Sequence, residues 1–272
     1  MSGTNLQWNK TNKIYDLFNT DHLYIQTKFI KQFRNRIVEL LIDKKLVNKK
    51  FTNLENLHNE ILNKDLINYE FESGVNGITK LFYDVDDKLI NIYINFLTEL
   101  HKKLKFDFYF QQTPTIRFHC PNAKNSEHYP RYHNDCLYGH PPQEINIWMS
   151  LTKNKTTGLD LIGFDKSKQW MSEYNFDINK FTKLAIESKK FNEKGNRLST
   201  QIDSTLKHVL LFDSLCIHTN QPRKNNSRVS IDVRINPVEK FEKGYVGVGR
   251  MKAEFKPGGK FGYNKKSIKE II

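Results

Sequence analysis

The sequence predicts an α+β fold in which helices come first and a jelly roll of short strands forms the main body. Apolar residues in the first hundred positions recur at three- and four-residue steps, the period of a helix with one buried face. After Lys105 the period changes to two, as in half-buried strands. Helices followed by many short strands with turns between them are typical of an α+β chain whose strands form a sandwich or jelly roll.

Three helical segments are expected in order. The first begins at Asp21, which we expect to cap it, and carries an apolar stripe as far as Leu41. A shorter segment spans 54–66, and the strongest spans about 77–104. The last segment contains an acidic cluster that lacks the glycine and the closing glutamate of a calcium-binding EF-hand loop, so we interpret it as a solvated helix face. The cluster consists of Asp84, Asp86 and Asp87.

Alternating or continuous apolar runs predict the strands. The chain therefore divides into a helical N-terminal part (1–104), a strand-rich core (105–240) and a C-terminal tail (241–272), with no linker between independent domains. A long polar insertion with some helical character interrupts the core over 165–204. The expected strands are 106–110, 115–119, 144–152, 158–164, 208–217 and 228–235.

The composition limits the classes of partner. The net charge is +13, but the lysines are scattered from Lys10 to Lys269 without an arginine-rich stripe or a known nucleic-acid motif. The chain is rich in Lys, Asn and Ile together, so we interpret the charge as compositional and nucleic acid as the less favoured partner.

The compartment is also indicated by the sequence. No apolar run approaches the roughly 20 residues of a membrane helix, and the first residues lack the apolar core of a signal peptide. Three cysteines with no close pair predict free thiols in a reducing compartment. We therefore expect a cytoplasmic protein with no membrane partner.

Five polar residues in the second half of the chain are the candidates for chemistry: His133, Asp135, His218, Arg228 and Ser230. Two histidines and one carboxylate are the facial triad that holds Fe(II) and leaves coordination positions open. On a strand His133 and Asp135 face the same side, and His218 is expected at the end of a long apolar strand. Arg228 and Ser230 share a strand face, where a guanidinium and a hydroxyl together suit a carboxylate.

With these residues the chain resembles the Fe(II)/2-oxoglutarate-dependent oxygenases, which have a double-stranded β-helix, a cupin-like jelly roll. Within them it is most similar to the phytanoyl-CoA dioxygenase-like branch, and to a bacterial subgroup that includes a streptomycin-biosynthesis oxygenase. The similar stretches are 114–119, 133–135, 144–152 and 210–237, within the region 106–237. The helical N-terminal part and the tail are not matched.

The resemblance implies a reaction and a set of roles. His133, Asp135 and His218 would bind Fe(II) and form the catalytic centre, where O₂ reacts. Arg228, assisted by Ser230, would hold the far carboxylate of the co-substrate 2-oxoglutarate, with Asn146 and Arg117 as further candidate contacts. Relatives that halogenate have a small residue at the position of Asp135, so the carboxylate there favours hydroxylation or a related C–H oxidation such as desaturation or ring closure.

The substrate implied by this reading is a small polar or anionic metabolite, and a homo-oligomer is compatible with the sequence. Trp148, Asn220, Arg131 and Tyr132 are candidate substrate contacts, although Trp148 also suits a half-buried sheet and Asn220 a turn. Two alternatives remain open. One is the same chemistry on a protein or nucleic acid, and the other is a non-enzymatic ligand-binding module of cupin type.

Overall fold

Two antiparallel sheets form the body of the molecule in the computed structural model, which describes residues 13–70, 75–125, 132–153, 158–202, 206–220, 225–240 and 262–272. The large sheet has the order β1-β7-β4-β9-β2, and β3 also pairs with β9. The small sheet has the order β6-β5-β8. The large sheet contains β1 (His22–Gln26), β2 (Phe108–Phe110), β3 (Thr115–His119), β4 (Ile145–Ser150), β7 (His208–Asp213) and β9 (Arg228–Pro237). The small sheet contains β5 (Leu159–Leu161), β6 (Thr200–Gln201) and β8 (His218–Asn220).

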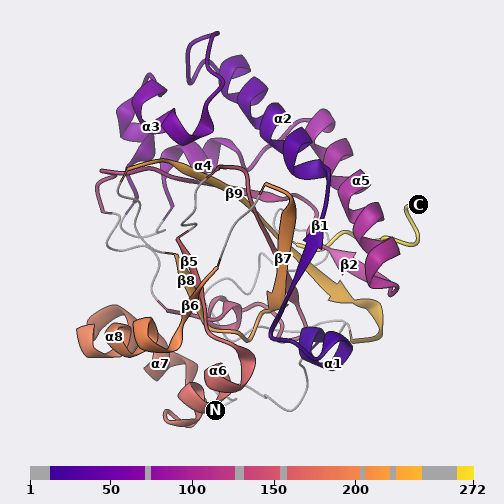
Figure 1. Ribbon diagram of the computed structural model, residues 1–272, viewed down its shortest axis with the longest axis vertical. Coiled ribbons are helices and arrows are strands. Elements are labelled where there is room, and N and C mark those ends of the chain that lie inside the picture. Colours follow the sequence, from indigo (N-terminus) through magenta and orange to yellow (C-terminus); the bar gives the residue numbers. More distant parts are fainter. Residues whose placement is uncertain are drawn as a thin grey trace.

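Helices cover both ends of this body. In Figure 1, α2 and α5 lie along the outer side of the large sheet, and α6, α7 and α8 gather beside the small sheet. The α-helices are α1 (Lys13–Phe18), α2 (Phe29–Asp43), α3 (Leu57–Glu60), α4 (Gly77–Leu81), α5 (Asp87–Leu104), α6 (Phe164–Ser172), α7 (Ile178–Glu187) and α8 (Lys189–Leu198). The 3-10 turns are η2 (Leu54–Asn56), η3 (Lys64–Ile67), η5 (Asp135–Tyr138) and η6 (Val238–Lys240).

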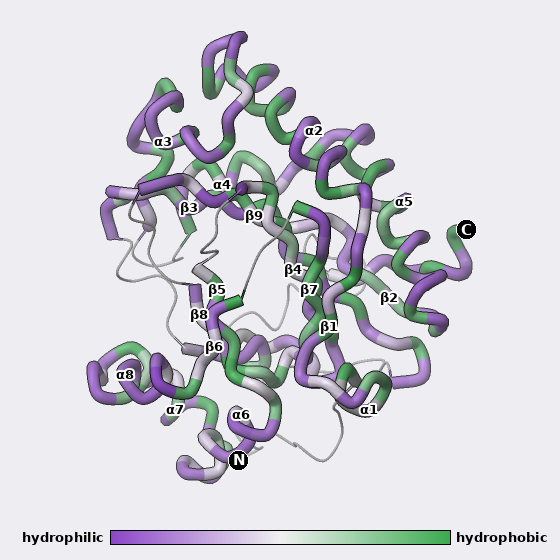
Figure 2. Tube along the Cα trace, viewed as in Figure 1, coloured by the Kyte–Doolittle hydropathy of each residue, from purple (hydrophilic) through white to green (hydrophobic). Residues whose placement is uncertain are grey.

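The two faces of the large sheet have different surroundings. Its outer face packs on the N-terminal helices in one hydrophobic core that includes Ile147, Leu211 and Ile231. Its inner face contributes Trp148 and Leu210 to a second core shared with β5, α6 and α7. Figure 2 shows the hydrophobic residues concentrated on β7 and mixed with hydrophilic ones along the covering helices. The predicted α+β jelly roll is confirmed by this pair of facing antiparallel sheets.

The first helix was predicted to begin at Asp21, which is too early. Residues 22–26 form the edge strand β1, which pairs with β7, and α2 starts only at Phe29. Asp21 does not cap this helix; its Oδ1 atom accepts a hydrogen bond from the Phe164 backbone N–H at 2.9 Å. Tertiary pairing with β7 therefore outweighs a helical period that continues through Ile25.

The long helix predicted over 77–104 is broken in two, as α4 and α5. Asp86 lies at the break, where its side chain accepts a hydrogen bond from the Leu89 backbone N–H at 3.0 Å and caps α5. Asp86 also forms an ion pair with Arg36 of α2. The interpretation of the acidic cluster as a solvated helix face is therefore wrong for Asp86. The helix predicted over 54–66 is likewise divided into η2, α3 and η3.

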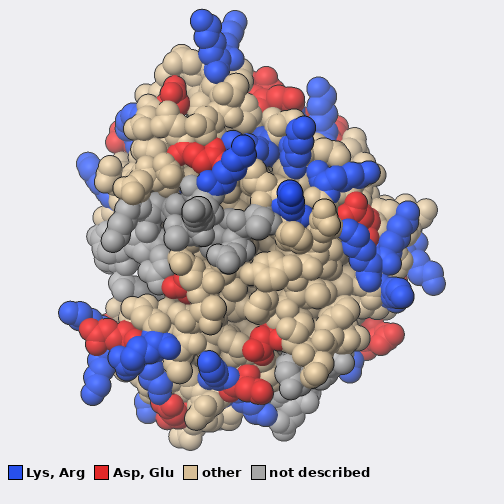
Figure 3. Space-filling view, viewed as in Figure 1, with Lys and Arg blue, Asp and Glu red and all other residues tan. Residues whose placement is uncertain are grey.

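Charged side chains of both signs lie on the face of the molecule drawn in Figure 3. On the face drawn in Figure 3, lysines and arginines are interspersed with aspartates and glutamates over the described residues. None of the helices in the described ranges combines the length and the apolar character required to span a bilayer.

Replacing Gly195 of α8 with alanine should destabilise the protein by about 1–3 kcal/mol. A Cβ atom at this position would lie 2.3 Å from the Tyr132 ring, which is too close for any real contact. In an open helix the same change stabilises by up to about 1 kcal/mol, so the sign of the effect is diagnostic. Urea unfolding measures this change in the free energy of unfolding. The sign should reverse in a Tyr132→Ala background, and a stabilised single variant would contradict this packing.

All three cysteines should be inert to Ellman's reagent in the native protein. Cys120, Cys136 and Cys216 are free and buried, as the sequence predicts for free thiols. Burial raises the pKa of the Cys120 thiol to about 11 and raises those of the other two as well, so little reactive thiolate exists at neutral pH. Three thiols should react once the chain is unfolded in guanidinium. Rapid reaction of the native protein would contradict the burial.

Candidate active site

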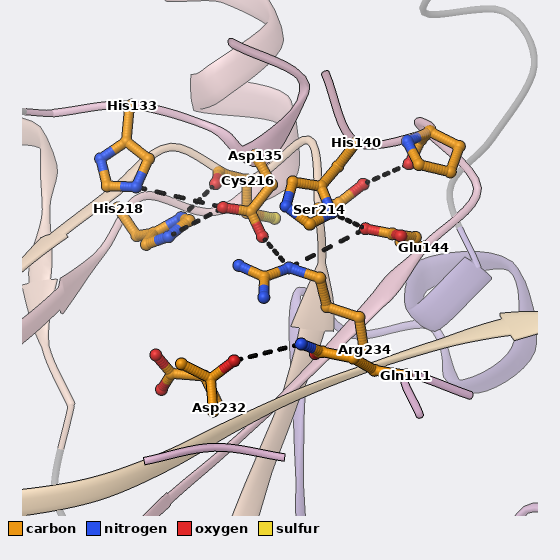
Figure 4. Close-up of polar contacts among 12 residues, drawn as sticks. Gln111, His133, Asp135, His140, Glu144, Ser214, Cys216, His218, Asp232 and Arg234 are labelled. Carbon is orange, nitrogen blue, oxygen red and sulfur yellow. Dashed lines mark hydrogen bonds and ion pairs between the residues drawn. The ribbon is translucent and has the colours of Figure 1, made fainter. Parts of the chain in front are cut away.

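The side chains of His133, Asp135 and His218 meet in one cluster, as predicted. Their ligand atoms all lie within 4.8 Å of one another. Asp135 Oδ1 is 4.0 Å from His133 Nε2 and 3.7 Å from His218 Nε2, and Figure 4 shows all three groups pointing toward the same point. Because a metal–nitrogen bond is about 2.1 Å long, one ion between these atoms can contact all three. Two imidazoles and one carboxylate suit Fe(II).

His133 and Asp135 do not lie on one strand, as the expected shared facing of their side chains required. His133 forms an isolated bridge with His218, in which the two residues exchange backbone hydrogen bonds of 3.0 and 2.8 Å. Asp135 then opens the turn η5, and its backbone N–H donates to the Ser214 carbonyl at 3.0 Å. The side chains converge because both residues are tied to the segment around His218, and strand alternation is not the reason.

His218 does not end the predicted long strand. β7 ends at Asp213, a buried turn follows, and His218 begins β8 in the other sheet. The apolar run continues past the strand because Leu215 and Ile217 are buried in the second core. His218 Nδ1 lies 3.0 Å from the Cys216 carbonyl. Donation to that carbonyl places the proton on Nδ1 and leaves the Nε2 lone pair for a metal.

Arg234 is a site residue that the sequence analysis missed. Its Nε donates to Asp135 Oδ2 at 2.9 Å and lies 3.9 Å from Glu144 Oε2, so the guanidinium stands between two buried carboxylates (Figure 4). Burial raises the pKa of the Asp135 carboxyl, but the Arg234 guanidinium, together with the imidazoles around the carboxylate, outweighs burial and holds this pKa well below its usual range. Asp135 is therefore ionised and ready to bind a cation.

Glu144 has further partners of its own. His140 Nδ1 lies 2.7 Å from Glu144 Oε2, and the Tyr263 hydroxyl donates to Glu144 Oε1. Tyr263 belongs to the predicted tail, of which residues 241–261 lie outside the described part of the structure. Residues 262–268 are held along β2, where the Asn264 backbone N–H donates to the Phe110 carbonyl at 2.8 Å. The alternation of β9 marks Arg234 as inward-facing, but no local signal pairs it with Asp135 or with Glu144.

The predicted co-substrate residues lie on the inner face of the large sheet. Arg228 is only 1 % exposed, and its Nη2 donates to the Asn220 side-chain carbonyl at 2.6 Å. Ser230 and Asn146 are also buried. The Ser230 hydroxyl and both atoms of the Asn146 amide have no hydrogen-bond partner among the described residues. Because an unpaired buried polar group is costly, these atoms fit a polar ligand that completes their hydrogen bonds.

Arg117 is placed beside this group. It lies opposite Ser230 in the pairing of β3 with β9, so both side chains face inward, and it forms an ion pair with Asp232. This contact occupies Arg117 Nε, whereas Arg228 lies deeper and next to the Trp148 ring, 6.0 Å from its centroid. Arg228 is therefore the better placed of the two to hold a carboxylate.

The candidate substrate contacts have different surroundings. Trp148 lies on the inner face of β4, and Asn220 contacts Arg228, so both adjoin the site. The Tyr132 hydroxyl lies 2.9 Å from both Asn196 Oδ1 and Ser199 Oγ, and its ring packs on Trp170. These contacts place the Tyr132 side chain against α8. Arg131 lies outside the described residues.

Part of this chain is similar to a known protein sequence. No family model matches the chain. The streptomycin biosynthesis protein StrG of Streptomyces griseus is 30% identical over 102 residues, which are 33% of this chain and 50% of StrG. The chain thus spans about half the length of this curated relative. The match agrees with the predicted similarity to a streptomycin-biosynthesis protein.

Solved structures with a related backbone are remote. EctD from S. alaskensis with bound Fe has a TM-score of 0.48 and 13% identity, covering 95% of this chain and 88% of that one. The non-heme alpha-ketoglutarate-dependent carbocyclase SnoK from nogalamycin biosynthesis has a TM-score of 0.41 and 7% identity, covering 84% and 85%. The 2OG complex of the viral collagen prolyl hydroxylase vCPH from Paramecium bursaria Chlorella virus-1 has a TM-score of 0.39 and 12% identity, covering 80% and 97%. The chemistry is therefore inferred from this chain's own residues.

Proposed function

We propose that the protein is a non-haem Fe(II)/2-oxoglutarate-dependent oxygenase. The observation that carries this proposal is the convergence of His133, Asp135 and His218 on one point. Three protein ligands leave coordination positions open on an ion that prefers six, as oxygen activation requires. The buried Arg228 and the Ser230 hydroxyl, which has no hydrogen-bond partner among the described residues, would supply a carboxylate site on the same inner sheet face.

The protein residues have separate tasks in this reaction. Iron and 2-oxoglutarate, when bound, supply the oxidising chemistry, which couples decarboxylation of 2-oxoglutarate to hydroxylation or a related C–H oxidation. His133, Asp135 and His218 would hold the iron, and Arg228 with Ser230 would orient the co-substrate. The second core, which packs β5 and α6–α8 against the inner sheet face, excludes bulk water from that side.

The proposed substrate is a small polar or anionic molecule. The inner face of β3 and β9 carries Arg117, Arg228 and Arg234, and Asp232 beside them adds a negative charge. Arg117 is paired with Asp232, and Arg234 with Asp135, so this inner face is polar and favours a polar ligand over an apolar one.

Succinate formation tests the proposal. Protein reconstituted anaerobically with Fe(II) and then given 2-oxoglutarate and O₂ should release succinate, slowly without substrate and faster with it. A His133→Ala variant is the matched control, because the His133 side chain, 12% exposed against 9% for His218 and 2% for Asp135, is the least buried of the three. Equal succinate from both proteins, or none from wild type, would refute the assignment.

A further inference from the structure

A chain of contacts leads from the C-terminal segment to the metal-binding carboxylate. The Tyr263 hydroxyl donates to Glu144 Oε1, Glu144 Oε2 lies 3.9 Å from Arg234 Nε, and Arg234 Nε donates to Asp135 Oδ2. Tyr263, Glu144 and Asp135 are 4%, 1% and 2% exposed, so the contacts are screened little by solvent. Glu144 directly precedes β4, Arg234 belongs to β9, Asp135 begins η5, and Tyr263 lies in the segment along β2.

The contact between Arg234 and Asp135 fixes the orientation of the Asp135 carboxylate. Arg234 occupies Oδ2, and the other oxygen, Oδ1, is the one that faces His133 and His218. A carboxylate that is held by one oxygen in this way cannot rotate freely, so its second oxygen is already in place when a metal arrives.

The contact between Arg234 and Glu144 determines the net charge beside the metal site. Arg234 alone would cancel the charge of Asp135 and make the pocket unattractive to a divalent cation, at a separation of 2.9 Å in a buried site. Glu144, 3.9 Å from the same guanidinium, brings the formal charge of Asp135, Arg234 and Glu144 to −1, and His140 Nδ1 lies 2.7 Å from Glu144 Oε2. Tyr263 holds Glu144 at this position by a hydrogen bond to its other oxygen.

We propose that Arg234, Glu144 and Tyr263 are positioning residues for the metal ligand Asp135. Arg234 orients the ligand carboxylate, Glu144 restores the negative charge that attracts the ion, and Tyr263 holds Glu144 in place. This inference rests on the metal-binding part of the proposed function, and it makes the segment around Tyr263 part of the site.

Binding of Co(II), an air-stable probe with a visible spectrum, tests the inference. Glu144→Gln keeps the shape of the side chain and removes its charge, so the Kd for Co(II) should rise about 10- to 100-fold. Glu144→Asp, which keeps the charge, should bind more tightly than Glu144→Gln. Tyr263→Phe should raise the Kd less than Glu144→Gln does and should change the Co(II) absorption bands.

Tyr93→Phe is the matched control. Tyr93 is another buried tyrosine, and its hydroxyl donates at 2.7 Å to the carbonyl of Gln111, the bridge partner of Tyr263, so this variant weakens support of the same segment without touching the Tyr263–Glu144 hydrogen bond. This variant should lose stability but keep the wild-type Kd and spectrum. If wild type binds Co(II), and Glu144→Gln and Tyr263→Phe match it in Kd and spectrum, the positioning role is overturned while the metal site stands. If wild type binds no Co(II), the metal site and the positioning role both fall.

Discussion

Replacing Arg228 with methionine should raise the KM for 2-oxoglutarate on the order of 30- to 3,000-fold. Methionine fills similar space but removes the buried guanidinium, which is 1 % exposed and can form two parallel hydrogen bonds to a carboxylate. Loss of one partner of a buried charged contact costs about 2–5 kcal/mol, and each 1.4 kcal/mol is about a tenfold change in affinity. Steady-state kinetics at saturating Fe(II) measures the effect.

Arg117→Met distinguishes the two inward-facing arginines. Arg117 already pairs with Asp232, so its loss should change the KM for 2-oxoglutarate by less than tenfold. Arg228→Lys should fall between the methionine variant and wild type, because an ammonium keeps the charge but not the paired hydrogen bonds. A larger KM effect for Arg117→Met than for Arg228→Met would assign the carboxylate site to Arg117.

Asp135→Asn should abolish Fe(II) binding and also destabilise the metal-free protein by about 3 kcal/mol. The first effect is the loss of a charged ligand. The second arises because Arg234 loses its 2.9 Å partner in a buried position, which costs about 3–5 kcal/mol. We expect the lower end because Glu144 remains 3.9 Å from Arg234. Metal titration and urea unfolding in the presence of a chelator measure the two effects separately.

His133→Ala separates these two consequences. It should also lose Fe(II), but it leaves the Asp135–Arg234 pair intact, so the metal-free protein should lose less stability than Asp135→Asn does. If both variants lose the same stability without metal, the buried ion pair contributes nothing measurable.

The stability difference between wild type and Asp135→Asn should depend on pH in a defined direction. The pKa of Asp135 is lower in the folded protein than its ordinary value of 3.8, mainly because the nearby charges outweigh the effect of burial. Such a group contributes fully to stability above the unfolded pKa and loses that contribution as the pH falls toward the folded pKa. The difference should therefore be constant near neutrality and shrink below about pH 4.

Local periodicity predicted the parts of the fold that depend on local sequence. β9 and its two faces were predicted correctly, because a strand buried against helices on one side alternates in its own residues. β1 was predicted as helix, because its identity depends on pairing with residues 208–212, far along the chain. The break before α5 was also missed. In the sequence Asp86 looks like one more acidic residue of a helix, and only its contacts with Leu89 and Arg36 show that it caps α5.

The candidate site was also predicted only in part from the sequence. Residue type and spacing singled out the three residues that cluster, His133, Asp135 and His218, but a bridge and a turn bring them together where strands were expected. The roles of these residues and of Arg228 stay predictions. Arg234 was missed as a partner of Asp135 because the two lie 99 positions apart. Such long-range contacts between charged residues leave no periodic signal in one sequence.

The bridge between His133 and His218 has a consequence for the order of folding. His133 and Asp135 are both fastened to the β7–β8 segment, and β7 is itself held by β1, with His22 opposite Phe212. Pairings between residues this distant form slowly, because the chain loses the entropy of closing a long loop before the stabilising contacts form. We therefore expect the ligand cluster to be assembled among the last events of folding, so that iron is captured by a nearly finished protein and does not nucleate it.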